Sequence, residues 1–97
     1  MNKKLALLAA GAALLSTNAF AVSHGEAIAS TCLSCHGPGG KSAGAIPGLA
    51  GLEKGYIVEA MKDFKSGKRQ GTIMKRHAAG YTDAEYAEMA EYFSKLK

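Results

Sequence analysis

The sequence predicts an all-α domain with about three main helices. Apolar residues recur at helical spacing over 53–66 and 82–96, and a capped segment that begins at Ser23 predicts a shorter first helix. No segment shows the alternation of apolar and polar residues that is typical of β-strands. The chain has 97 residues and no internal repeat, so we expect a single domain.

The first residues resemble a secretory leader. Two lysines precede an apolar run from Leu5 to Leu15, and an A-x-A cleavage signal ends at Ala21. The run is shorter than the about 20 residues that a membrane-spanning helix needs. We therefore expect a signal peptide over 1–21, an exported domain over 22–97 in the periplasm, and no transmembrane segment after cleavage. An anchor that stays uncleaved is the alternative.

The first helix leads directly into the motif that carries the chemistry. Ser23 and Glu26 have the S-x-x-E spacing of a capping box, and the helix they begin continues into C-x-x-C-H at Cys32, Cys35 and His36. Cysteines three residues apart lie on one helical turn, where both sulfurs can reach the two vinyl groups of one porphyrin. The histidine follows as the proximal iron ligand. The motif predicts one covalently attached haem c.

Other uses of two cysteines explain the motif less well. The chain has no further cysteines for a zinc site, and a C-x-x-C redox pair normally lies in a βαβ context. A disulfide between Cys32 and Cys35 would close a very small ring and leave His36 without a role. A domain of this size is also marginal on its own core, so we expect the apoprotein to be poorly folded.

The segment 37–51 is rich in Gly, Ala, Ser and Pro and has no periodicity, which predicts a long loop. A long loop in a compact domain needs a reason, and wrapping the edge of a cofactor is one. Within it, the turn Ile46-Pro47-Gly48-Leu49 carries two apolar side chains. We expect Ile46 and Leu49 to face a dry environment at the cofactor.

Two longer helices follow the loop. The helix over 53–66 ends at Gly67, and its apolar stripe consists of Tyr56, Ala60 and Phe64, with Ile57 and Met61 beside them. The helix over 82–96 begins with a capping box formed by Thr82 and Glu85. Its apolar face consists of Tyr86, Met89, Ala90, Phe93 and Leu96.

Met74 is the strongest candidate for the sixth iron ligand, opposite His36. It lies in the segment 68–80, which we expect to be non-helical, so that a loop folds over the far face of the ring and presents the thioether. His77, in the same segment, is its rival. An open sixth position for a small molecule would instead indicate a gas sensor or a haem enzyme.

The remaining candidates for this position are weaker. Met61 and Met89 fall on apolar helical faces, where methionine usually fills the core. His24 precedes the first helix and is too close in sequence to His36 to reach the far side of the ring easily.

The charge pattern excludes one class of partner. The net charge of +4 includes two lysines of the leader, and no basic patch is interleaved with aromatic residues, so nucleic-acid binding is not indicated. Five basic residues could instead surround the haem edge and steer acidic partners: Lys41, Lys68, Arg69, Lys75 and Arg76.

Over residues 22–97 the sequence resembles the class I cytochromes c, through C-x-x-C-H-G, the turn at Pro47, Met74 and an aromatic pair near the end of the last helix. The resemblance implies that the carbonyl of Pro47 accepts the Nδ1–H of His36. It also implies that the first and last helices cross, with Gly25 and Ala29 against Phe93. Gly48 departs from the Asn that many members carry.

A narrower resemblance is to the haem subunits of flavocytochrome c sulfide dehydrogenases. It rests on the runs F-K-S-G at 64–67, T-I-M at 72–74, A-G-Y-T at 79–82 and M-A-E-Y-F at 89–93. It implies an electron-transfer protein that serves as the haem subunit of a sulfide–cytochrome c reductase and accepts electrons from an FAD-containing sulfide dehydrogenase subunit. Many such haem subunits have two haem domains, and this chain has room for one. A carrier that diffuses freely between redox complexes is the alternative.

Overall fold

The computed structural model describes residues 21–97, and its regular elements in that range are all helical. In chain order they are α2 (His24–Ala29), η1 (Ser30–Cys32), α3 (Leu33–His36), η2 (Pro38–Gly40), α4 (Lys54–Ser66), α5 (Thr72–Ala79) and α6 (Asp83–Ser94). The all-α prediction is therefore confirmed. The predicted signal peptide, except for Ala21, lies outside the described residues.

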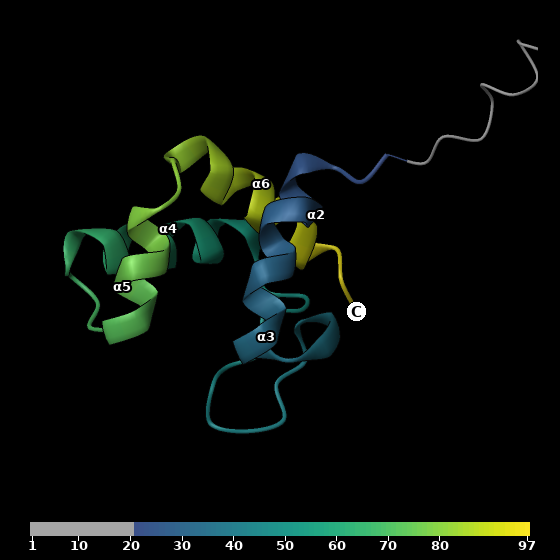
Figure 1. Cartoon of the computed structure of the whole chain (residues 1–97), viewed down its shortest axis with the longest axis horizontal. Helices are drawn as coiled ribbons and strands as arrows, with labels where there is room; N and C mark the ends of the chain where they lie inside the picture. Colours follow the sequence, from purple (N-terminus) through teal and green to yellow (C-terminus); the bar gives the residue numbers. More distant parts are fainter. Residues whose placement is uncertain (1–20) are drawn as a thin grey trace, which may run out of the picture.

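Helix α6 supplies half of the buried apolar residues and the three largest fully buried side chains of the described chain. The predicted capping box is present, because Thr82 and Glu85 each accept the other's backbone N–H. Four of the five residues of the predicted apolar face are at most 2% exposed, and the fifth, Leu96, is half-buried. One buried face on a capped helix is the pattern that the sequence predicts. Helices α2 and α4 pack against this face, and α5 packs mainly on α4 (Figure 1).

Helix α2 crosses α6 at very short range. Ser23 caps α2 by accepting the N–H of Glu26 at 3.1 Å, which is one half of the predicted capping box. A Cβ on Gly25 would lie 2.5 Å from the carbonyl oxygen of Glu88, so only glycine fits at this crossing. The resemblance placed Gly25 against Phe93; the structure places it against Glu88 instead, while Ala29 is fully buried in the core.

Helix α4 begins at Lys54, one residue after the predicted start, and ends at Ser66 as predicted, with Gly67 as its C-cap. The centre of its predicted apolar stripe is wrong: Ile57 and Met61 are the buried residues, and Tyr56 is 54% exposed. The reason is that α4 serves two neighbours. It packs on α6, and Tyr56, with the rest of the predicted stripe, lines a cavity on its other flank.

The segment around Met74 differs most clearly from the structure that the sequence predicts. We expected 68–80 to be non-helical, but Thr72–Ala79 forms α5, and Met74 is its third residue. A helix this short is stabilised by packing rather than by propensity. Its N-cap, Gly71, has no side chain that could signal a helix start, and the burial of Ala78 is visible only in the folded chain.

The loop between η2 and α4 is long and irregular, as predicted. Its middle is pinned to its start, because the N–H groups of Leu49 and Ala50 both donate to the carbonyl of Gly40, at 2.7 and 3.0 Å. Of the helices described over 21–97, none has the length and apolar character needed to cross a bilayer.

Candidate haem site

A cavity of about 430 Å³ is lined by residues of η1, α3 and the loop that follows, of α4 and of α5. This volume is typical of small-molecule and cofactor sites. Its wall is mostly apolar and includes Leu52, Ile57, Met61, Phe64, Met89 and Phe93. All six residues that the sequence nominated for the cofactor also line it: Cys32, Cys35, His36, Pro47, Leu49 and Met74.

The two cysteines lie at one edge of this cavity. Cys32 ends η1, and Cys35 lies in α3, so the helical backbone carries both thiols to the same wall. Both are free, and no disulfide joins them. Burial raises the pKa of the Cys32 thiol, and a hydrogen bond with Thr31 opposes this more weakly. The thiols are therefore available for thioether bonds at C-x-x-C spacing.

His36 is held in one orientation. It is the last residue of α3 and only 7% exposed, and its Nδ1 lies 2.7 Å from the carbonyl oxygen of Pro47. Because a carbonyl only accepts hydrogen bonds, Nδ1 carries the proton and Nε2 keeps a free lone pair. This is the hydrogen bond that the resemblance implied. It gives the imidazole the tautomer of a metal ligand.

The turn that carries Pro47 also shapes the cavity wall. Leu49 is half-buried and packs against the core, in agreement with the expected dry environment. Ile46 does not follow that expectation: it lines the cavity but is 45% exposed. The backbone of Leu49 is held by a hydrogen bond of 2.7 Å to the carbonyl of Gly40, and Ile46 has no comparable backbone bond within 21–97.

The wall opposite His36 is formed by α5. Met74 is half-buried and packs against the core, and its side chain lines the cavity. His77 lies nearly one turn later, also lines the cavity, and is exposed. The helix therefore brings both candidates for the sixth ligand to the same space, with the methionine deeper than the histidine.

A polar corner of the cavity was not singled out by the sequence. The guanidinium of Arg69 lies 4.7 Å from the centre of the Phe64 ring, and its Nη1 donates to the Tyr56 hydroxyl at 3.5 Å. All three residues line the cavity. A guanidinium beside a phenol is suited to a carboxylate. In the sequence Arg69 was only one of several basic residues, and no pattern joined it to Tyr56.

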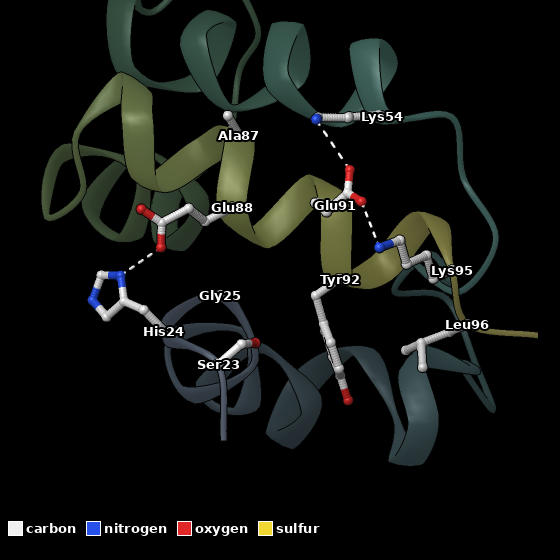
Figure 2. Close-up of a pocket in the computed structure, with 10 residues that line it drawn as sticks. All are labelled: Ser23, His24, Gly25, Lys54, Ala87, Glu88, Glu91, Tyr92, Lys95 and Leu96. Atoms are coloured by element: carbon white, nitrogen blue, oxygen red, sulfur yellow. Dashed lines mark hydrogen bonds and ion pairs between the residues drawn. The ribbon is translucent and has the colours of Figure 1, made fainter. Parts of the chain in front are cut away.

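His24 has a different environment, at the outer side of the α2–α6 crossing. Its Nδ1 lies 2.5 Å from a carboxylate oxygen of Glu88 (Figure 2). Its Nε2 lies 3.8 Å from a carboxylate oxygen of Glu85. A second hollow there is lined by neither cysteine nor by His36. This position agrees with the prediction that His24 does not reach the iron.

The residues present fit a covalently bound haem. An apolar cavity with two free thiols on one edge would hold the ring by thioether bonds, and His36 offers an unprotonated nitrogen from one side. Met74 offers a thioether from the other side, and the Arg69 corner could receive a propionate. Within 21–97, every buried side-chain nitrogen or oxygen atom has a hydrogen-bond partner in the protein.

Comparison with known proteins agrees with this geometry. Residues 22–97 match the family model for cytochrome c. The chain is 46% identical over 74 residues to the cytochrome subunit of sulfide dehydrogenase of Chlorobaculum tepidum, covering 76% of this chain and 67% of that protein. It is 37% identical over 71 residues to the thiosulfate dehydrogenase electron acceptor of Thiomonas intermedia, covering 71% of this chain and 33% of that protein.

A solved structure supports the same assignment. The chain superimposes on cytochrome c4 of Acidithiobacillus ferrooxidans with a TM-score of 0.65 at 40% identity, covering 67% of this chain and 38% of that one. The chain thus spans about a third of two of these three relatives. The fold is the small cytochrome c fold that the resemblance implied, with haem c as its covalent cofactor. On these grounds the chain belongs to the cytochrome c family.

Proposed function

We propose that this cytochrome transfers single electrons in the periplasm through one haem held between His36 and Met74. The observation that carries the proposal is the cavity whose two walls present these side chains, with the imidazole already fixed by the carbonyl of Pro47. When bound, haem supplies a one-electron iron couple. If His36 and Met74 both hold the haem iron, no position is left for a substrate, and the site would suit a carrier rather than a sensor.

The chain's own residues set how such a site behaves. Cys32 and Cys35 would fix the ring to the η1–α3 segment, and His36 would donate its Nε2 lone pair from the tautomer that Pro47 enforces. A thioether at Met74 favours the reduced state, and the apolar wall from α4 and α6 excludes water and favours the less charged form. Together these features favour a raised reduction potential of the haem iron.

The position of the domain in the cell belongs to the same proposal. We infer that residues 1–21 are a cleaved signal peptide and that 22–97 form the mature domain. The sequence of the leader supports this, and so does the C-x-x-C-H motif, since haem is attached to it outside the cytoplasm.

An FAD-containing sulfide dehydrogenase subunit is the electron donor that we propose. The support is the identity to the Chlorobaculum tepidum subunit. The surface also suits an acidic partner: four of the five basic residues expected to steer partners lie on the α4–α5 turn and on α5, and within 21–97 none of the four forms an ion pair. A second candidate is a carrier for another dehydrogenase, which the relative of Thiomonas intermedia favours.

Stopped-flow reduction separates these donors. The oxidised cytochrome is mixed with periplasmic extract of the native cells and either sulfide or thiosulfate, and haem reduction is followed by absorbance. Faster reduction with sulfide than in an extract-free control supports the sulfide dehydrogenase, and the rate should fall with added salt. Faster reduction with thiosulfate alone supports the second candidate. If neither donor gives a rate above the control, both donor assignments are wrong.

A further inference from the structure

The hydroxyl of Tyr86 joins two helices that otherwise touch little. Tyr86 lies on α6 and is fully buried, and its hydroxyl donates to the backbone carbonyl of Ala78 in α5. Ala78 is itself fully buried. The phenol therefore does more than fill the core, because its polar atom makes a directed contact with the helix that carries Met74.

This contact acts at the right place on α5. Ala78 lies one helical turn after Met74, so a restraint on its carbonyl also restrains the turn that presents the thioether. Carbonyls in the last turn of a helix lack donors from within the helix. Apart from Tyr86, the carbonyl of Ala78 accepts only backbone N–H groups just beyond the helix, including that of Tyr81 at 3.3 Å.

The other contacts of α5 do not replace the hydrogen bond from Tyr86. On its N-terminal side α5 packs on α4, where the Phe64 ring lies close to Gly71. Beyond its C-terminus, the Tyr81 hydroxyl lies 3.3 Å from Oγ1 of Thr31, but both residues lie outside α5. The ring of Tyr86 also faces α4, because Nζ of Lys65 lies 5.9 Å from the centre of that ring. Its side chain thus lies where three helices meet.

We infer that Tyr86 is a positioning residue for the sixth iron ligand, and that its hydroxyl holds α5 in the place that presents Met74 to the cavity. The inference rests on the proposed ligation by Met74. Without the hydroxyl, α5 keeps its packing but loses its directed tether, so the site with Met74 detached becomes more populated. One hydrogen bond of ordinary strength corresponds to a change of about three- to tenfold in that population.

The test is Tyr86→Phe in the haem-loaded protein, with Tyr92→Phe as the matched control. Tyr92 lies on the same helix, is half-buried, and its hydroxyl has no hydrogen-bond partner within 21–97. We expect Tyr86→Phe to keep its covalent haem and to bind carbon monoxide about three- to tenfold more tightly in the ferrous state. Its far-red methionine–iron(III) absorption should weaken. Tyr92→Phe should stay within twofold of wild type.

A merely structural role gives a different result. Tyr86→Phe would then unfold at a lower temperature but keep wild-type affinity for carbon monoxide, and that outcome overturns the inference. If Tyr86→Phe yields no holoprotein, amide hydrogen exchange of the wild-type holoprotein tests the inference instead. The backbone amides of 76–79 should then exchange no faster than those of α6. Faster exchange at 76–79 overturns the inference. If wild type itself lacks the methionine–iron absorption, the proposed ligation fails first, independently of Tyr86.

Discussion

The two walls of the haem cavity are built in different ways. His36 is placed by its own motif and by Pro47, which lies in the loop that follows directly, through one hydrogen bond of 2.7 Å. Met74 lies on a short helix whose position depends on Phe64 before it and Tyr86 after it. The first wall is specified locally, whereas the second depends on tertiary packing.

This difference teaches where the site is robust and where it can change. Substitutions on the wall of His36 and the cysteines should remove the cofactor and with it the fold, because the remaining core is small. Substitutions on the wall of Met74 should leave the cofactor attached and alter only the sixth position. The following predictions test this division, from the largest expected effect to the smallest.

Removal of both thiols should have the largest effect. In Cys32→Ala with Cys35→Ala the polypeptide should carry no covalent haem and show little fixed tertiary structure, because the haem completes the core. Mass spectrometry and near-ultraviolet circular dichroism measure the two properties. Ser34→Ala is the control within the motif, since it keeps both thiols and removes an exposed hydroxyl that donates to the carbonyl of Thr31 and lies 4.0 Å from Sγ of Cys35. A double variant with wild-type cooperativity of thermal unfolding contradicts the prediction.

Loss of the thioether should change the site without removing the cofactor. Met74→Ala should keep covalent haem, bind carbon monoxide in the ferrous state and have a lower potential, because methionine favours reduced iron. Met61→Leu and Met89→Leu are the controls, and each should cost less than about 1.5 kcal/mol of stability and leave the potential unchanged. Redox titration of the three variants in one buffer measures the reduction potentials. If the methionine–iron(III) absorption is lost in Met61→Leu or Met89→Leu but kept in Met74→Ala, then Met74 is not the sixth ligand.

An added methyl group at the start of α5 sharpens the comparison further. Gly71 is extended, with φ −176°, so alanine is compatible with its backbone, but its Cβ would lie 2.8 Å from the Phe64 ring and 3.3 Å from Cβ of Met74. Gly71→Ala should therefore destabilise the protein by about 1–3 kcal/mol and increase carbon monoxide binding.

Gly55→Ala is the matched control, because its Cβ meets nothing within 4 Å and it lies inside α4. It should stabilise the fold by about 0.5–1 kcal/mol, since alanine is the better helix former. Denaturant unfolding gives both values. Equal stability of the two variants would show that α5 is not tightly packed on α4.

The smallest effect concerns a region that belongs to neither wall. On the outer face of α6, hydrogen bonds from Lys95 and Lys54 lower the pKa of Glu91 below its ordinary 4.5, at distances of 2.6 and 3.0 Å (Figure 2). A lowered pKa in the folded state gives stability that is present above the ordinary pKa and is lost as the pH falls through the lowered value. Glu91→Gln should thus be slightly less stable than wild type at neutral pH, and the difference should vanish in acid. The potential should stay unchanged in both conditions.

Sequence reasoning reached the first wall more fully than the second. The motif at 32–36 identified the thiols and His36. The helical spacing of apolar residues located α4 and α6, together with Gly67 at the end of α4 and the capping box of α6, because these signals are local. Met74 was brought to the cavity as expected, but on a helix instead of a loop. Gly71 gives no capping signal, and the buried position of Ala78 depends on α6, which lies later in the chain.

Two further contacts could not be read from the sequence for the same reason. Tyr86 was correctly assigned to the core, but its spacing on α6 says nothing about where its hydroxyl points. Tyr56 was assigned to a buried stripe, whereas it faces the cavity beside Arg69, a residue beyond the end of its own helix. Helical periodicity shows that a residue lies on an apolar face but does not show which neighbour that face meets.

The absorption spectrum of the oxidised wild-type holoprotein, followed by reduction under carbon monoxide, tests the central claim most directly. If His36 and Met74 both bind the iron, the oxidised protein shows the weak far-red charge-transfer band of a methionine–iron(III) bond. The reduced protein then keeps a low-spin spectrum that carbon monoxide does not change. An oxidised spectrum without that band, together with ready binding of carbon monoxide, would contradict the claim and would assign the site to a sensor or a haem enzyme.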